Sequence, residues 1–261
     1  YAALRQVQRR GVNVVTVEDP VEYRLPGIAQ VQVNERAGLT FAAALRSILR
    51  QDPDVVLVGE IRDRETAAIA VQASLTGHLV LSTLHTIDAA SAVTRLADLG
   101  VEPFKIAAAL RAVVAQRLVR RLCAGCRRPV APGWTHARLR GAPPDGEPAY
   151  AAAGCDACGG SGYRGRSSVV EILLGDADVA RAIALGEPPA RLAAAARAGG
   201  ARSLWESGVA HLRAGVTDVE ELLRVLEPPA ASGASADAAP RAAGRSAPST
   251  LPDLDAAFDL V

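Results

Sequence analysis

The chain has 261 residues, a formal net charge of +1 and an aromatic content of 3%. So small a charge and so few aromatic rings argue against a dedicated nucleic-acid-binding protein, which usually presents a basic face and rings that stack on bases. The length is sufficient for a complete α/β core and a smaller second module. No apolar run of about 18 residues or more occurs, so the sequence predicts no membrane-spanning helix. It also lacks the charged and apolar regions of a secretory signal peptide.

Residues 1–121 are predicted to alternate between strands and helices. Short apolar runs predict three buried strands, at 12–17, 55–58 and 79–84. Apolar residues at helical spacing predict one helix at 64–76 and another that runs from Asp88, a candidate N-cap, to Gly100. Strands that alternate with helices of this length favour a mostly parallel sheet with crossover connections.

The character of the sequence changes after residue 121. The segment 123–165 is rich in Gly, Pro and Cys and has little periodicity, so we expect something other than a hydrophobic core to hold it together. Composition and periodicity together predict four regions along the chain: 1–121, 122–168, 169–227 and 228–261.

A helical pattern returns in the third of these regions. Three residues mark candidate helix starts: Asp176, Leu204 and Thr217. Thr217 and Glu220 have the spacing of a capping box, in which each side chain bonds to a backbone N–H of the other end. The last region, 228–261, is dominated by Ala, Pro, Ser and Gly, which predicts a disordered tail.

Acidic residues follow two of the predicted buried strands. Glu18 follows the first strand, within Glu-Asp-Pro-Val-Glu, and Glu60 follows the second, within Gly-Glu-Ile-Arg-Asp. In open parallel sheets the ligand lies outside the carboxyl ends of the strands. A carboxylate there can hold Mg²⁺ or polarise the water that attacks a phosphate. Each segment alone is equally consistent with an acid that caps the next helix or solvates a turn.

A third polar cluster is predicted at the same edge. The strand at 79–84 is flanked by His78 and His85, and Thr83, His85 and Thr86 lie at its carboxyl end. An imidazole at that position can donate a hydrogen bond to a phosphate oxygen, although a single histidine at a strand end is more often structural. Three polar clusters at one edge of one sheet favour a phosphate-handling site.

These segments resemble the secretion-superfamily ATPases that drive type II secretion and type IV pilus assembly. Residues 18–22 resemble the Asp box of that family, residues 54–63 its Walker B segment, and residues 77–86 its His box. The resemblance implies an α/β fold with a RecA-like P-loop NTPase core. It also implies that Glu18 activates the attacking water, that Glu60 is the Walker B acid on Mg²⁺, and that His85 contacts or senses the phosphates of ATP. The implied nucleotide site comprises Glu18, Asp19, Glu22, Asp54, Gly59, Glu60, Arg62, His78, Thr83 and His85.

The phosphate-binding loop of this family is absent from the sequence. A P-loop reads G-x-x-x-x-G-K-[ST], and the only lysine, Lys105, lies far from any glycine-rich turn. There is no methionine, even at position 1. We therefore expect the sequence to start within a longer reading frame, just after the loop, so that the core lacks its N-terminal part. We also expect this chain alone to bind ATP weakly or not at all.

Four cysteines form two C-x-x-C pairs. We call Cys123 and Cys126 the first pair, and Cys155 and Cys158 the second pair. Two such pairs can bring four thiolates to one point, which suits a structural Zn²⁺ with no open position. A redox dithiol or two disulfides are the alternatives. The resemblance implies the same zinc module, since the secretion and pilus-extension ATPases carry it and the pilus-retraction relatives lack it.

The resemblance further implies how the protein works and where. It implies a homo-hexameric motor at the cytoplasmic face of the bacterial inner membrane, bound there through secretion or pilus platform proteins. Two other functions remain open at this point. One is a non-catalytic, zinc-containing interaction subunit of the same machinery. The other is a zinc-ribbon nucleic-acid protein, against which the charge and the few aromatic residues argue.

Overall fold

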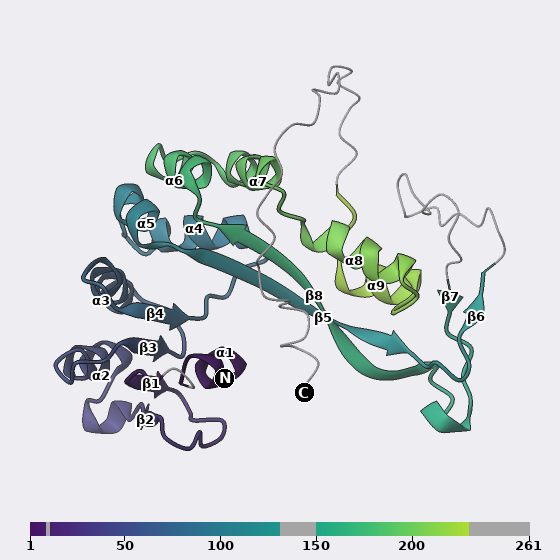
Figure 1. The fold of residues 1–261 in the computed structure, drawn as a ribbon, viewed down its shortest axis with the longest axis horizontal. Coiled ribbons are helices and arrows are strands. Elements are labelled where there is room, and N and C mark those ends of the chain that lie inside the picture. Colours follow the sequence, from purple (N-terminus) through teal and green to yellow (C-terminus); the bar gives the residue numbers. More distant parts are fainter. Residues whose placement is uncertain (9–10, 131–149, 230–261) are drawn as a thin grey trace. The chain divides into compact units, whose positions relative to one another are not determined.

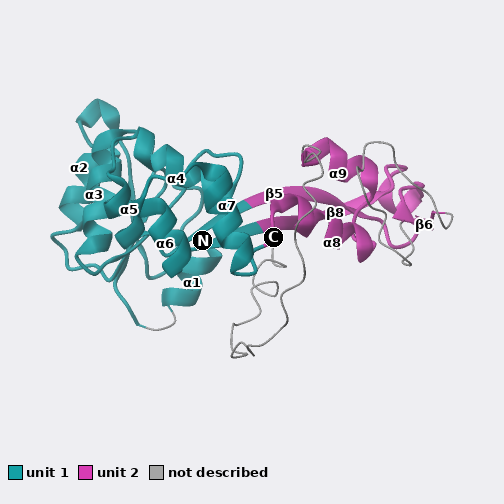
Figure 2. Ribbon diagram, turned by 90° about the horizontal axis from the view of Figure 1, so that it is seen from above, with its two compact units in different colours: residues 1–115, 171–201 teal, residues 116–170, 202–261 magenta. Residues whose placement is uncertain are grey.

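The computed structural model describes residues 1–8, 11–130 and 150–229. They form two compact units, each discontinuous in sequence (Figure 2). Unit 1 comprises Tyr1–Ala115 and Glu171–Ala201, and unit 2 comprises Gln116–Val170 and the residues from Arg202 onward. The chain therefore leaves unit 1, builds most of unit 2, and returns to unit 1 before it completes unit 2.

A four-stranded sheet lies at the centre of unit 1 (Figure 1). Its strands are β1 (Val14–Glu18), β2 (Ala29–Gln32), β3 (Val55–Val58) and β4 (Leu79–Ser82). Their order is β2-β1-β3-β4, and all neighbouring pairs are parallel. The predicted parallel sheet is confirmed. The strand predicted at 55–58 is β3, with the same bounds, and the strand predicted at 79–84 is β4, which ends two residues earlier.

The two faces of the sheet carry alternate side chains, as a two-residue repeat requires. Val14 and Val55 are paired in register and pack with Leu4 of α1 (Ala2–Gln8). The next residues along each strand, Val15 and Val56, are also buried and by this alternation face the other way. The central strands β1 and β3 are thus covered on both faces, which agrees with their almost uninterrupted β-branched residues.

Helices of unit 1 connect the strands and begin at identifiable caps. The helices are α2 (Phe41–Ile48), α3 (Arg64–Leu75), α4 (Ala89–Asp98) and α5 (Pro103–Ala109), and a short 3-10 turn spans Glu35–Ala37. The Asp63 side chain accepts a hydrogen bond from the N–H of Thr66 at the start of α3, and Asp88 does the same for Ser91 in α4. The predicted helices at 64–76 and from Asp88 are therefore confirmed, whereas α2 and β2 were not predicted.

Two further helices complete unit 1 after the chain returns to it. They are α6 (Ala177–Ala184) and α7 (Pro189–Ala198). Asp176 caps α6 by accepting from the N–H groups of Asp178 and Val179, as the predicted helix start requires. The helical pattern predicted from residue 169 is wrong for its first residues, because the strand β8 (Tyr163–Leu174) continues through them. A short apolar run that includes Val169, Val170 and Ile172 does not distinguish strand from helix by periodicity.

Unit 2 holds the cysteines and the last two helices. The long strands β5 (Ala112–Leu122) and β8 pair with each other, and all but the first four residues of β5 and the last four of β8 belong to unit 2. The short strands β6 (Arg128–Pro129) and β7 (Tyr150–Ala151) form an antiparallel pair. A 3-10 turn spans Asp156–Cys158, and the helices are α8 (Leu204–Arg213) and α9 (Val219–Val225).

The caps of these two helices test the predicted helix starts. Helix α8 begins at Leu204 as predicted, after a capping box between Ser203 and Glu206. The capping box predicted at Thr217 is wrong. Asp218 caps α9 instead, and the Thr217 hydroxyl donates to the carbonyl of Arg120 at 3.0 Å. A carboxylate one position later offers the stronger acceptor for the helix N–H groups.

The compact units are defined by contacts in the structure, whereas the four predicted regions were defined by composition and periodicity. The helices predicted as one region at 169–227 divide between the units, with α6 and α7 in unit 1 and α8 and α9 in unit 2. All but the first two residues of the predicted tail, 228–261, lie outside the described residues. Among the helices that are described, none is both long and apolar enough to cross a lipid bilayer.

Candidate active site and metal centre

Two carboxylates lie at the carboxyl edge of the central sheet. Glu18 is the last residue of β1, and Glu60 comes two residues after the end of β3. Since β1 and β3 are neighbours and parallel, both acids emerge at the same edge of the sheet. We call the edge that carries Glu18 and Glu60 the acid edge. Glu18 is only 4% exposed and Glu60 only 9%. Acids this buried are rare unless polar partners compensate them.

Glu18 is held by three hydrogen-bond donors that the sequence analysis did not identify. The hydroxyls of Tyr1 and Thr16 donate to its two carboxylate oxygens, and Gln30 Nε2 donates at 3.0 Å. Burial, assisted by the bond to the carboxylate, raises the pKa of the Tyr1 hydroxyl, so it remains protonated as a donor at neutral pH. The Glu18 carboxylate therefore sits in a fixed orientation at the strand end.

Two of these donors follow from strand geometry. Thr16 lies two residues before Glu18 on β1, and thus on the same face. Gln30 of β2 is the register partner of Thr16. The first relation was available from the sequence, whereas the second required knowledge that β2 exists and pairs with β1.

Two exposed side chains, Arg62 and His85, lie beside the Glu60 carboxylate. Arg62 Nε bonds to its Oε2 oxygen, and His85 Nε2 lies 3.4 Å from the same oxygen. The side chains of Arg62 and His85 are 67% and 85% exposed. Both can therefore swing toward a ligand at this edge without leaving a packed core, while the Glu60 carboxylate itself stays in place.

The turn between β3 and Glu60 is fixed by close backbone contacts. Gly59 N donates to Val17 O at 2.7 Å, and a side chain at Gly59 would place its Cβ 3.3 Å from Glu18 Cα. The Thr83 hydroxyl, one residue past β4, donates to Gly59 O at 2.6 Å. Thr83 thus connects the third polar segment to the acid edge, and His85 follows it two residues later.

Asp19 and Glu22 complete the cluster next to Glu18. Both are exposed, and the backbone N–H of Glu22 donates to the Tyr1 hydroxyl at 3.2 Å. The structure therefore gathers residues from all three predicted segments at one edge: Glu18, Asp19, Glu22, Gly59, Glu60, Arg62, Thr83 and His85.

Asp54 and His78 are not brought to this edge. They precede β3 and β4 and so lie at the amino ends of these strands. Asp54 Oδ2 accepts from the N–H of Asn13 at 2.7 Å, and His78 Nδ1 lies 3.0 Å from Ala73 O. The first contact joins the segments that precede β1 and β3, and the second joins the segment before β4 to α3.

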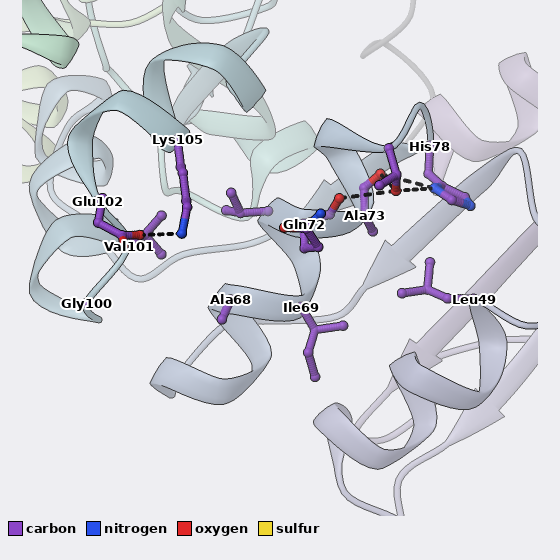
Figure 3. Close-up of a pocket in the computed structure, with 12 residues that line it drawn as sticks. Leu49, Ala68, Ile69, Gln72, Ala73, His78, Gly100, Val101, Glu102 and Lys105 are labelled. Carbon is purple, nitrogen blue, oxygen red and sulfur yellow. Dashed lines mark hydrogen bonds and ion pairs between the residues drawn. The ribbon is translucent and has the colours of Figure 1, made fainter.

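His78 instead borders a pocket of about 550 Å³ between α3, α5 and neighbouring loops (Figure 3). The pocket is lined mainly by apolar side chains, among them Leu49, Ile69 and Val101. Lys105 also lines it, but its ammonium group is already paired with Glu102 at 2.8 Å. The pocket shares no lining residue with the acid edge.

The four cysteines of unit 2 converge on one point. Their sulfur atoms all lie within 4.8 Å of one another. The measured pairs are Cys123–Cys155 at 3.9 Å, Cys126–Cys158 at 3.9 Å and Cys155–Cys158 at 3.8 Å. A tetrahedral site with Zn–S bonds of about 2.3 Å has sulfur–sulfur edges of about 3.8 Å. The cluster therefore has the dimensions of a tetrahedral metal site, and its sulfurs are too far apart for disulfide bonds of about 2.05 Å.

Backbone donors favour the thiolate form in the second pair. The N–H groups of Cys155 and Gly162 each lie 3.2 Å from Cys158 Sγ. The bond from Cys155, supported by that from Gly162, lowers the pKa of the Cys158 thiol to about 6. Burial raises the pKa of Cys126 to about 11, so its thiolate needs a positive charge nearby. A metal ion held by the four sulfurs would supply that charge.

The fold of the chain is similar to that of two ATPases of known structure. The pilus retraction motor PilT with bound ADP matches it with a TM-score of 0.60 and 25% identity, over 83% of this chain and 53% of that one. The Legionella pneumophila ATPase DotB, at 21% identity, matches the fold with a TM-score of 0.58, over 85% of this chain and 55% of that one.

The sequence identifies the family within this class. The model of the Type II/IV secretion system protein family matches residues 1–224, and the chain belongs to this family.

Curated relatives share more than half of their aligned residues with this chain. Type II secretion system protein HxcR of Pseudomonas aeruginosa is 55% identical over 71% of this chain and 36% of its own length. Type II secretion system protein E of Klebsiella pneumoniae is 56% identical over 71% and 37%. The type IV pilus assembly ATPase PilB of Thermus thermophilus is 52% identical over 71% and 21%. The chain thus spans between about a fifth and two fifths of the length of these relatives.

Proposed function

We propose that this chain is the C-terminal part of an ATP-hydrolysing motor subunit that powers type II protein secretion or type IV pilus assembly. The family membership and the printed names of its relatives support the process. The observation that carries the catalytic part is the pair of buried carboxylates at the ends of two adjacent parallel strands, Glu18 and Glu60.

Each residue of the acid edge has a role in this proposal. Glu18, fixed by its three donors, accepts a proton from the water that attacks the terminal phosphate. Glu60 with its hard carboxylate oxygens would hold Mg²⁺, which when bound neutralises phosphate charge. Arg62 and His85 are exposed cationic or hydrogen-bonding groups beside Glu60, and they are suited to contact phosphate oxygens.

The phosphate-binding loop comes from outside this sequence in our proposal. No G-x-x-x-x-G-K-[ST] string occurs in the 261 residues. The intact protein would supply the loop, and this chain alone would bind ATP weakly and hydrolyse little. The subunits would form a homo-hexamer that meets membrane platform proteins at the cytoplasmic face of the inner membrane.

The four-cysteine cluster would hold a structural Zn²⁺. All four positions of a tetrahedron are filled by sulfur from this chain, so none remains for a substrate or a reacting water. Held by these cysteines, a zinc ion would join two segments that are far apart in sequence and have little apolar packing of their own.

Conservative acid substitutions in the intact protein test the catalytic assignment. Glu60→Gln and Glu18→Gln should each lower steady-state ATP hydrolysis about 100-fold or more, because the shape is kept while the charge or base is lost. Binding of fluorescent ATP should change little. Glu187→Gln, between α6 and α7, is the matched control and should hydrolyse ATP normally.

Two outcomes would argue against this catalytic proposal in different ways. Near-normal hydrolysis in both acid variants would refute the assignment of Glu18 and Glu60. No hydrolysis by the unaltered intact protein, together with retained zinc, would instead support a non-catalytic interaction subunit of the same machinery.

A further inference from the structure

One short segment, residues 215–221, contacts the flanks of both cysteine pairs. It joins α8 to α9 and contributes the first turn of α9. We call it the brace. Its contacts come from both its backbone and its side chains, and all of them lie within unit 2.

The backbone of the brace is bound to residues beside the first pair. Leu122 N donates to Val216 O at 2.8 Å, directly before Cys123, and Arg127 Nη1 donates to Gly215 O at 2.7 Å, directly after Cys126. Gly215 has a φ of +63°, and a Cβ there would lie 2.7 Å from a ring carbon of Tyr150. Any other residue here would have to displace the Tyr150 ring and adopt a backbone conformation that L side chains rarely adopt.

The buried carboxylate of Glu221 binds β5 at Arg120, which lies three residues before Cys123 of the first pair. Arg120 donates to it from its backbone N–H at 2.9 Å and from Nε at 2.8 Å. The Arg120 guanidinium also lies 4.0 Å from the ring centroid of Tyr163, which belongs to β8. One arginine thus links the brace to both long strands, β5, which ends just before the first pair, and β8, which begins after the second pair.

Asp218 does the same for the second pair while it caps α9. Tyr163 Oη donates to it at 2.8 Å and Ala152 N donates at 3.1 Å, on either side of Cys155 and Cys158. The N–H of Glu221 donates to its other oxygen at 3.0 Å. Asp218 is only 5% exposed, so its charge depends on these donors.

We propose that the brace, with Asp218 at its centre, positions the two cysteine pairs for the metal before the metal binds. The pairs are separated by residues 127–154, and closing so long a connection costs entropy that a metal would otherwise have to offset. A framework that already holds both pairs lowers this cost and raises metal affinity. The same linkage implies that bound metal stabilises α9. This inference rests on the proposed zinc site and not on ATP hydrolysis.

Asp218→Asn in the full chain is the direct test. Asparagine caps helices as well as aspartate does, but it offers one acceptor oxygen where Asp218 uses two. We expect zinc affinity, measured by competition with a coloured chelator, to fall about tenfold. The rise in Tm that zinc produces should shrink as well. Asp98→Asn, an exposed site at the end of α4, is the matched control and should leave both values unchanged.

Tyr163→Phe provides an independent variant in case Asp218→Asn does not fold. It removes the hydroxyl that reaches Asp218 but keeps the ring beside Arg120, and it should weaken zinc binding in the same direction by a smaller factor. A merely structural role would lower Tm equally with and without zinc, leaving zinc affinity unchanged, and that result in either folded variant would overturn the proposal. Failure of the unaltered chain to bind zinc would instead refute the zinc site itself.

Discussion

The acid edge of unit 1 and the cysteine cluster of unit 2 are built in opposite ways. At the acid edge, neighbouring parallel strands carry the carboxylates into place, and two exposed side chains, Arg62 and His85, stand beside them. In the cysteine cluster, four sulfurs from loops meet within 4.8 Å and fill every position of a tetrahedron. The first site has exposed side chains that can contact other groups, whereas all four sulfurs of the second come from this chain.

This difference shows how each site depends on the rest of the molecule. Glu18 and Glu60 follow from the register of a sheet with a packed core, so they would keep their places without any ligand. The cysteines belong to segments with little apolar packing, and in our proposals they depend on the brace and on a bound metal ion. Substitutions should therefore have separate consequences in the two units.

Cys155→Ser should have the largest effect. Loss of one of four thiolates removes much of the metal-binding free energy, which is about 10–16 kcal/mol for structural zinc sites. We expect the purified variant to hold far less than one zinc per chain and unit 2 to become sensitive to protease. Hydrogen exchange in α2 and α3 of unit 1 should be unchanged. A variant that retained a full equivalent of zinc would contradict a four-sulfur site.

Glu221→Gln should come next, because its carboxylate is fully buried between two arginines. Burial alone would raise the pKa of Glu221, but the hydrogen bonds from Arg224 and Arg120 outweigh it and lower the pKa to about 2. The variant should lose roughly 3 kcal/mol of unfolding free energy at pH 7. Urea unfolding followed by tyrosine and tryptophan fluorescence measures it, with the exposed Glu227→Gln as the control.

The pH dependence of this difference has a definite sign. A carboxyl group whose pKa is lower in the folded state stabilises the fold above its unfolded pKa, here near the ordinary value of 4.5. The stabilisation should fade as pH drops from about 4.5 toward about 2. The gap between the unaltered chain and Glu221→Gln should narrow over that range, and a gap independent of pH would contradict the assigned ion pair.

Thr16→Val should have the smallest effect of the three and should be confined to the acid edge. It removes one hydroxyl donor to the buried Glu18 carboxylate and changes the side-chain volume little. We expect a loss of about 1–2 kcal/mol in the unfolding free energy of unit 1. Thr94→Val, at an exposed position on α4, should change it by less than about 0.5 kcal/mol. Equal effects from the two variants would mean that the Thr16 hydroxyl contributes nothing to holding Glu18.

Most of the acid edge could be predicted from the sequence, because strand ends and period-two alternation are local properties. The run from Val55 to Val58, which Glu60 follows, and the Asp88 cap are examples of such local signals. Gln30 could not be predicted as a partner of Glu18, since β2 is a short strand with half its residues exposed and little apolar signal.

Spacing predicted the cysteine ligands, but not what supports them. The two C-x-x-C pairs already indicated one four-sulfur site, which the structure assembles. The brace depends on contacts between residues far apart in sequence, such as Tyr163 with Asp218, 55 positions apart, and Arg120 with Glu221, 101 positions apart. No local pattern encodes such pairs, and the apparent capping box at Thr217 pointed one residue away from the true cap.

Thermal unfolding of the zinc-loaded chain with and without ATP and Mg²⁺ tests the contrast between the two sites most directly. If the metal site is complete in this chain and the nucleotide site is not, removal of zinc with a chelator lowers Tm, whereas millimolar ATP with Mg²⁺ leaves it unchanged. A rise in Tm with ATP that disappears when Mg²⁺ is omitted would contradict the account, because it would show that the acid edge binds nucleotide without the phosphate-binding loop.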